Sequence, residues 1–360
     1  MNRVTIANFS GLPEGMAGSL AHEWLASWSL PARMRAQLHT AHLPNLPIHT
    51  TLDLIRSCLK RLPQQFRLGW RARPLPSVIR DGRQDLQGQK MQVCSLYPLA
   101  LRDLLEAGDP HAAAFVFQMG VALAALVATL KLAPPESRLA RPEWPETHWQ
   151  RWQQINDMVL GGGLLSGILG QHLVAAACEW LPRLGVEDVR LHLFPEARQL
   201  MLHGAARQYS EGWVLAVDAG HTAIKRALIR LSAGEVVEVR PWPLVPTPYA
   251  LSEAPELLDV LSQICLEPLL EGVPARQVAL SVSAHLDYQG RIARATARGS
   301  FYSSLAGIDL SAALDQHLAR RLGGSTQICV MHEGQAAVQG LPGMGAALLL
   351  GTSVGGAFRA

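Results

Sequence analysis

Asp218 lies where its neighbours could bind a phosphate group. It follows the apolar run 214–217 and precedes Gly220, Thr222 and Lys225. A carboxylate can hold Mg2+, while backbone N–H groups, a hydroxyl and an ammonium can bind phosphate oxygens. We therefore predict a phosphate-binding turn at the end of a buried strand. The alternative is an ordinary β-hairpin in which the aspartate and the glycine only form the turn.

A second turn of the same chemistry follows the apolar run 347–350. Its glycines permit close backbone approach to an anion, and its hydroxyls can donate hydrogen bonds to it. The residues are Gly351, Thr352, Ser353, Gly355 and Gly356. Either turn alone is a weak signal, but the pair favours a protein that binds the phosphates of a nucleotide.

A run of three glycines, Gly161, Gly162 and Gly163, joins the apolar segment 157–160 to an amphipathic helix predicted to reach Leu181. Such a turn lets a flat ring lie against the backbone, next to a helix N-terminus. The alternative is a strand-to-helix turn that binds nothing.

These segments resemble motifs of the ROK-type sugar kinases, in the superfamily of sugar kinases, acetate kinases and actin. Residues 218–229 resemble its first phosphate motif, and residues 347–358 resemble its second. Residues 159–173 resemble its adenosine motif, and residues 200–207 resemble the end of its second lobe. The resemblance implies a two-lobed, ribonuclease-H-like α/β fold that binds ATP and Mg2+, with Asp218 holding the ion directly or through water.

The order of the motifs differs from that of ROK proteins, in which the first phosphate motif opens the chain. Here residues 161–163 precede Asp218. Reading from Trp213 to the end, and then from the start to Gln208, restores the usual order, so we infer a circular permutation. The rival explanation is an unrelated helical N-terminal domain fused to half of a kinase fold.

The permuted fold predicts how the elements are shared between the lobes. The helix-rich second lobe covers residues 1–209, the first lobe covers 210–345, and residues 346–360 return to the second lobe. In the first lobe we expect strands at 214–217, 224–231, 236–240, 278–282 and 327–331, helices at 254–270, 310–322 and 334–339, and a proline-rich connection at 241–248. Elsewhere we expect a short strand at 3–8 and helices at 20–29 and 112–132.

Catalysis would depend on His332 and Glu333, which follow the strand predicted over 327–331. ROK-like kinases usually carry Asn-Asp there, and the resemblance implies a general base at the second position and a sugar ligand at the first. Glu333 keeps a carboxylate, but its extra methylene moves that group by about 1 Å, a displacement that can cost about 100-fold in rate. His332 either binds a sugar hydroxyl or caps the following helix, so the site is either adapted or decayed.

Four further residues are candidate sugar ligands. His285 and Asp287 lie in the motif that connects the strand 278–282 to a glycine-containing loop. His22 and Glu23 lie in a segment that faintly resembles the one whose Glu and His hold sugar hydroxyls in ROK proteins. For this second pair, an exposed helix carrying two polar residues is the alternative.

Composition limits the partners. A formal charge of +3 without a long basic block, and without a helix-turn-helix pattern, argues against nucleic acid. Five cysteines without a CxxC pair, and without the zinc signature of ROK proteins, predict reduced thiols in a cytoplasmic protein and no zinc site. No secretory signal is recognisable, and we expect the apolar segment 112–132 to be a core helix rather than a membrane span.

The sequence therefore predicts ATP-dependent phosphorylation of a sugar hydroxyl with Glu333 as general base. On resemblance alone, the acceptor is a hexose or an N-acetylhexosamine. The expected partners are a sugar, a nucleotide and at most a second copy of the chain. Two alternatives stay open: a catalytically inactive regulatory protein that binds nucleotide or sugar, and a nucleotide hydrolase of the same fold.

Overall fold

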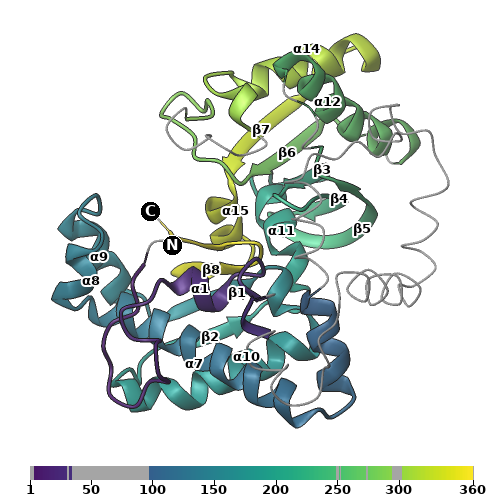
Figure 1. The fold of residues 1–360 in the computed structure, drawn as a ribbon. Helices are drawn as coiled ribbons and strands as arrows, with labels where there is room; N and C mark the ends of the chain where they lie inside the picture. The colour runs from purple at the N-terminus through teal and green to yellow at the C-terminus, as the bar shows by residue number, and fades with distance from the viewer. Residues whose placement is uncertain are drawn as a thin grey trace. The chain divides into compact units, whose positions relative to one another are not determined.

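The computed structural model describes residues 4–30, 32–34, 97–248, 251, 253–272, 275–293 and 302–359. The chain divides into two compact units, and each is a mixed α/β structure built on one mixed sheet (Figure 1). Among the described residues, those up to 198 and those from 341 onward form the first unit. Those from 199 to 340 form the second.

The second unit is built on a five-stranded sheet of order β5-β4-β3-β6-β7. Its strands are β3 (Gly212–Ala219), β4 (Ala223–Ser232), β5 (Glu235–Pro246), β6 (Gln277–Val282) and β7 (Gln327–His332). Strand β4 runs antiparallel to both neighbours, whereas β3, β6 and β7 run parallel. All five predicted strands are present, and β4, β6 and β7 have nearly the predicted limits.

Strand β5 is longer than the sequence suggests, because it continues through the expected connection at 241–248 as far as Pro246. That expectation is wrong for a physical reason. Strand β5 lies at the edge of the sheet, where proline removes no ladder hydrogen bond from a neighbour. An irregularity in the β4–β5 register, between Ile224 and Arg226, accompanies the prolines.

Helices cover both faces of this sheet. Helices α12 (Ala254–Glu271) and α14 (Leu310–Leu322) pack on the face that carries Leu215 and Val217. Helices α11 (Leu200–Ala206) and α15 (Glu333–Gln339) contact each other. Helix α11 also contacts β3 and β6, and α15 contacts β6 and β7. Successive side chains of a strand point to opposite faces, so Asp218 does not share the face of Leu215 and Val217. The strand period therefore places Asp218 on the α15 side. A short 3-10 helix, η4 (Ser303–Leu305), precedes α14.

The first unit contains a four-stranded sheet of order β2-β1-β8-β9. Its strands are β1 (Asp157–Gly161), β2 (Arg190–Leu193), β8 (Ala346–Leu350) and β9 (Val354–Phe358). Strand β1 is parallel to β2 and to β8, and β9 is antiparallel to β8. The predicted strand at 157–160 and the apolar run before Gly351 thus become adjacent central strands.

The helices of the first unit surround one apolar core. They are α1 (Ala21–Leu25), a helix over 97–106, α7 (Pro110–Leu132), α8 (Pro135–Leu139), α9 (Glu146–Gln154) and α10 (Gly167–Trp180), with 3-10 turns η1 (Gly163–Leu165), η2 (Leu181–Leu184) and η3 (Ala197–Gln199, which reaches the unit boundary). In the part of the chain that the structure describes, only α7 is long and apolar enough to cross a membrane, and 78% of its most apolar window is buried. That burial agrees with the expected core helix. Its start is fixed by Asp109, whose Oδ1 accepts from the Ala112 N–H at 2.8 Å.

The N-terminal elements are shorter than predicted. The expected strand at 3–8 is wrong within the described residues, where Thr5 forms only an isolated bridge with Leu20. The expected helix at 20–29 is wrong beyond Leu25, because Ala26 is extended. The Ser27 N–H then donates to the Gly351 carbonyl at 2.7 Å, so the chain leaves the helix to bond the turn after β8.

The two sheets share one arrangement of strands. In the second unit, β7, β6 and β3 are parallel and β4 returns antiparallel beside β3. In the first unit, β2, β1 and β8 are parallel and β9 returns antiparallel beside β8. The order along the chain differs, because the hairpin comes before the other two strands in the second unit and after them in the first.

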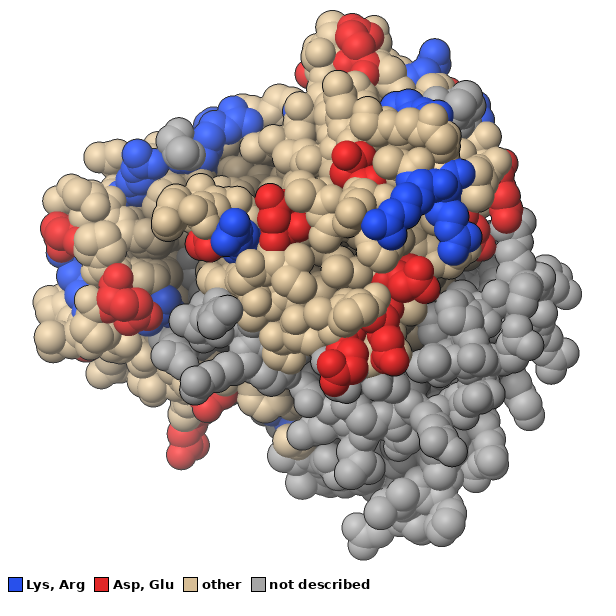
Figure 2. All heavy atoms as spheres, turned by 90° about the horizontal axis from the view of Figure 1, so that it is seen from above, with Lys and Arg blue, Asp and Glu red and all other residues tan. Residues whose placement is uncertain are grey.

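Charges of both signs are interspersed over the described part of the face shown in Figure 2. Lys and Arg side chains also gather along one edge of that face, at the upper left of the view.

Candidate functional site

Asp218 is a buried carboxylate with two partners. The side chain of Lys225, directly opposite on β4, places its Nζ 2.5 Å from Asp218 Oδ2. The Ser281 hydroxyl on β6 donates to Asp218 Oδ1 at 2.9 Å. Because the carboxylate is almost fully enclosed, an ammonium and a hydroxyl compensate a charge that water cannot reach. The ammonium of Lys225, which the sequence offered as a group for phosphate oxygens, thus bonds the aspartate in this structure.

The turn after Asp218 is braced from outside. The Thr247 hydroxyl donates to the Gly220 carbonyl at 2.7 Å, and the buried Tyr302 hydroxyl donates to the Ala219 carbonyl. The Gly220 N–H is bonded back to the Asp218 carbonyl at 3.1 Å. The loop is thus held in shape by side chains, and Thr222 lies at its tip with its side chain partly exposed.

Glu333 opens helix α15, at the carboxyl end of β7. Burial, and then the charge of Asp218, raise its pKa to about 7, and Lys225 opposes this rise. None of the described residues donates a hydrogen bond to its carboxyl group, and part of its surface remains exposed. A carboxyl group with these properties can exchange a proton near neutral pH.

Two imidazoles lie where the parallel strands β6 and β7 end. The rings of His332 and His285 are stacked, with centroids 4.6 Å apart and an interplanar angle of 4°. The His332 Nδ1 accepts from the Gly334 N–H at 3.0 Å, so His332 caps α15. Burial, and then the charge of His285, lower the pKa of His332 to about 4. At neutral pH, His332 is therefore uncharged and presents a donor at Nε2.

The contrast between the two carboxyl groups defines the site. Asp218 has an ammonium and a hydroxyl on its oxygens, whereas Glu333 has neither among the described residues. Two carboxyl groups in such different environments can have different roles. The oxygens of Asp218 are held by their partners, whereas the raised pKa of Glu333 suits it to carry a proton. The candidate site thus comprises Asp218, Lys225 and Ser281 with Glu333, His332 and His285.

The glycine turns of the first unit pack against each other. Gly161 pairs with Leu349 in the β1–β8 ladder. Gly162 has a φ of +107°, and a Cβ there would lie 2.3 Å from the Leu350 carbonyl oxygen. Only glycine fits this contact. The predicted adenosine turn and second phosphate turn, far apart in sequence, are therefore neighbours within one unit.

The residues of the predicted second phosphate turn are accessible. Gly351, Thr352, Ser353, Gly355 and Gly356 are all partly exposed. The Gly351 N–H is bonded to the Ser353 carbonyl at 3.0 Å, which closes the turn between β8 and β9. None of the described residues lies within 4 Å of the position of a Cβ on Gly351 or on Gly163.

The remaining predicted ligands have local roles. Asp287 Oδ1 accepts from the Gln289 and Arg291 N–H groups, which makes it a turn residue. Glu23 accepts from the Leu20 N–H at 3.0 Å, and the His22 ring contacts Trp28. His22 and Glu23 belong to the first unit, whereas His285 and Asp287 belong to the second.

Three supporting residues escaped the sequence analysis. Ser281 is the lone hydroxyl in an apolar strand, and that isolation was the available signal. Tyr302 and Thr247 are distant from Asp218 in sequence, and no local pattern marks them. Their roles depend on backbone carbonyls that only the folded loop brings within reach.

The side chains of the candidate site could hold Mg2+ only together with the phosphates of a bound ligand. The described residues contain no group of three His, Cys, Asp or Glu side chains placed to hold a metal. Mg2+ commonly uses one or two carboxylates together with substrate phosphates and water. Asp218 is the carboxylate available for this, and Lys225 would have to yield its contact with Oδ2.

No protein-family model matches the chain, and the curated proteins give no match either. Among solved structures, the chain is similar to the crystal structure of inorganic polyphosphate/ATP-glucomannokinase from Arthrobacter sp. strain KM. The sequence identity is 24% and the TM-score is 0.30. The match covers 41% of this chain and 58% of that chain, little more than half its length. This likeness is too distant to assign a function, which is therefore argued from the site.

Proposed function

We propose that the protein transfers the γ-phosphoryl group of ATP to a sugar hydroxyl, with Glu333 as general base. The observation that carries the proposal is the carboxyl group of Glu333, which has no donor among the described residues and lies close enough to Asp218 for that charge to raise its pKa. The sequence resemblance to ROK-type sugar kinases supports the choice of acceptor, a hexose or an N-acetylhexosamine.

In this reaction the Glu333 carboxylate removes the proton of the acceptor hydroxyl as its oxygen forms a bond to the γ-phosphorus. The bond between the γ-phosphorus and the bridging oxygen breaks, ADP leaves, and Glu333 carries the proton. His332 presents its Nε2–H as a donor for an oxygen of the acceptor. Mg2+, held with the nucleotide, supplies charge neutralisation for the phosphates.

We further propose that each unit is a ribonuclease-H-like half and that the chain is circularly permuted. The support is the shared strand arrangement, in which the hairpin β8–β9 has the place of β3–β4, and β1 and β2 have the places of β6 and β7. A chain that starts at Gly212 and joins residue 359 to residue 4 through a linker should fold with a Tm within a few degrees of the parent. Failure of that chain to fold cooperatively would count against the permutation.

A second candidate is a protein that binds nucleotide without transfer. The observation that favours it is the contact between Lys225 and Asp218, which occupies the carboxylate that Mg2+ would need. A kinase would have to break the contact between Lys225 and Asp218 when Mg-nucleotide binds, whereas a protein that only binds nucleotide would not.

The test is ADP release from Mg-ATP across a panel of hexoses and N-acetylhexosamines. We expect sugar-dependent release that Glu333→Gln lowers by about 100-fold or more, the usual contribution of a general base. The matched control is Glu238→Gln, a partly exposed glutamate of β5 paired with Arg230 and Arg240, which should retain activity.

Other outcomes discriminate among the candidates. Release without sugar, lost in Glu333→Gln, would indicate a nucleotide hydrolase. A rise in Tm with Mg-ATP but no release would favour the binding protein. If Mg-ATP gives no ADP release and also no change in Tm, the nucleotide site itself is refuted.

A further inference from the structure

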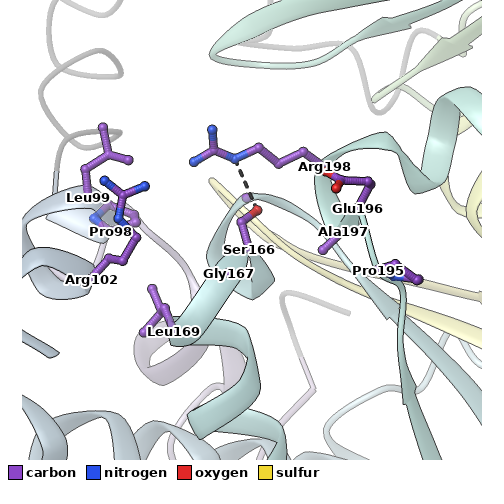
Figure 3. A pocket seen from close by; sticks show the side chains of 11 residues that line it. Pro98, Leu99, Arg102, Ser166, Gly167, Leu169, Pro195, Glu196, Ala197 and Arg198 are labelled. Atoms are coloured by element: carbon purple, nitrogen blue, oxygen red, sulfur yellow. Dashed lines mark hydrogen bonds between the residues drawn. The ribbon is translucent and has the colours of Figure 1, made fainter. Parts of the chain in front are cut away.

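A pocket of about 190 Å3 lies in the first unit at the start of helix α10 (Figure 3). The helix over 97–106 contributes Leu99 and Arg102, and the start of α10 contributes Ser166 and Gly167. The segment after β2, residues 195–198, forms the third wall. The pocket thus joins three parts of the chain that are distant in sequence.

Arg198 enters this pocket without a counter-ion. Its Nε donates to the Ser166 hydroxyl oxygen at 3.1 Å, and no carboxylate of the described residues pairs with its guanidinium. Burial, and then the charge of Arg102, lower the pKa of Arg198. A partly buried cation that is repelled by a second cation is stabilised by an anion placed between them.

Arg102 reaches the pocket from another wall. Its NH2 group is 3.0 Å from Asp103 Oδ1, and its Nε is 3.6 Å from Glu106, too far for a hydrogen bond. The Nε atom is buried and has no hydrogen-bond partner. Figure 3 shows the guanidinium groups of Arg102 and Arg198 extending toward the same space.

The backbone adds to this positive surface. Helix α10 has 14 residues, its N-cap Ser166 makes no side-chain capping bond, and no acidic residue lies in its first turn. The free N–H groups at a helix start carry a partial positive charge. Among the residues that line the pocket, the one acidic side chain is the exposed Glu196.

We propose that this pocket binds a phosphoryl group, held by Arg198 and Arg102 against the N-terminus of α10. The planar guanidinium matches phosphate oxygens in a two-point contact, which an ammonium cannot reproduce. The phosphoryl group has two possible sources, a free inorganic phosphate or the phosphates of a nucleotide. The pocket is also lined by Gly163 of the predicted adenosine turn. The proposal nevertheless needs neither a sugar nor phosphoryl transfer, so its test is separate from that of the kinase proposal.

The experiment measures binding of inorganic pyrophosphate to the full chain by calorimetry, at constant ionic strength and without nucleotide. We expect saturable binding that Arg198→Gln weakens about tenfold or more, and that Arg198→Lys restores only in part. The matched control is Arg183→Gln, because Arg183 is an exposed arginine paired with Glu179 just beyond α10. It removes the same charge and should leave the dissociation constant unchanged.

The outcomes that overturn the site are absence of saturable binding, or equal weakening by Arg183→Gln and Arg198→Gln. If Arg198→Gln does not fold, Arg102→Gln serves as the second variant, with the same expected weakening. A titration in saturating ATP separates the sources: competition indicates nucleotide phosphates, and an unchanged dissociation constant indicates free phosphate. Pyrophosphate binding without any kinase activity would support this site while the kinase proposal fails.

Discussion

The ammonium of Lys225 contacts the buried carboxylate of Asp218 directly across the β3–β4 ladder. The Ser281 hydroxyl occupies the other carboxylate oxygen. The aspartate side chain is only 2% exposed, so its charge depends on these two partners rather than on water. The predicted phosphate turn therefore begins at an ion pair, and any ligand that needs the carboxylate must displace the lysine.

Replacing Lys225 by Met should destabilise the fold, because it leaves a buried carboxylate without its cation. Breaking a buried pair typically costs about 3–5 kcal/mol. The double variant Asp218→Asn with Lys225→Met should recover much of that loss. Urea unfolding of the single and double variants measures both effects.

The control for this prediction is Arg190→Met. Arg190 pairs with Asp157, but its side chain is 70% exposed, so the loss should be much smaller than for Lys225→Met. Equal losses for Lys225→Met and Arg190→Met would contradict the role assigned to burial.

Glu333 should make the folded state less stable as pH rises from about 4.5 to about 7. Its pKa is raised on folding, so the folded chain holds this proton more tightly than the unfolded chain within that window. The contribution is present at low pH and is lost as pH rises through the folded pKa. Glu333→Gln should therefore gain stability relative to the parent, by roughly 1–3 kcal/mol between pH 4.5 and 7.5. A pH-independent difference in the free energy of unfolding would contradict this.

His332 should change the stability in the opposite direction, because it makes the folded state less stable as pH falls. Its pKa falls from 6.5 to about 4 on folding, so the unfolded chain binds the proton more tightly. Its contribution is present above pH 6.5 and is lost as pH falls toward 4. Protonation also removes the acceptor at Nδ1 that caps α15.

His332→Asn tests this, because asparagine is a good N-cap that does not titrate. The variant should resist acid better than the parent below about pH 6 while keeping similar stability at pH 8. His317 lies inside α14 and caps no helix, so His317→Asn shows whether any change of histidine to asparagine shifts the acid limb of the stability curve. If both variants shift that limb equally, the cap does not explain it.

The sequence was sufficient for most strands and helices of the second unit, because their periods and end signals are local, but it did not predict helix α11. Helix α14 matches its predicted limits, with Asp309 as N-cap and Gly323 as the left-handed residue after it. Strand β5 was underestimated because its prolines are tolerated only through its edge position, which is a property of the whole sheet.

The sequence predicted most residues of the candidate site but not which of them contact one another. Asp218, Thr222 and Glu333 stand out in the sequence through the turns and strand ends around them. The contact between Asp218 and Lys225 depends on the hairpin register, and the packing of Gly162 on Leu350 depends on the neighbouring positions of β1 and β8. Neither follows from spacing along the chain.

The packing of the two glycine turns gives the final prediction. Gly162 has a φ of +107° and faces the Leu350 carbonyl oxygen, which a Cβ would approach to 2.3 Å. Gly162→Ala should therefore cost about 3 kcal/mol or more, because backbone atoms of β8 must move or the turn must change conformation. Gly163→Ala is the matched control, since none of the described residues lies within 4 Å of its Cβ position. It should change the free energy of unfolding by about 0.5 kcal/mol or less. Urea unfolding of the two variants gives the comparison, and equal losses would show that Gly162 does not hold the predicted adenosine turn against the predicted second phosphate turn.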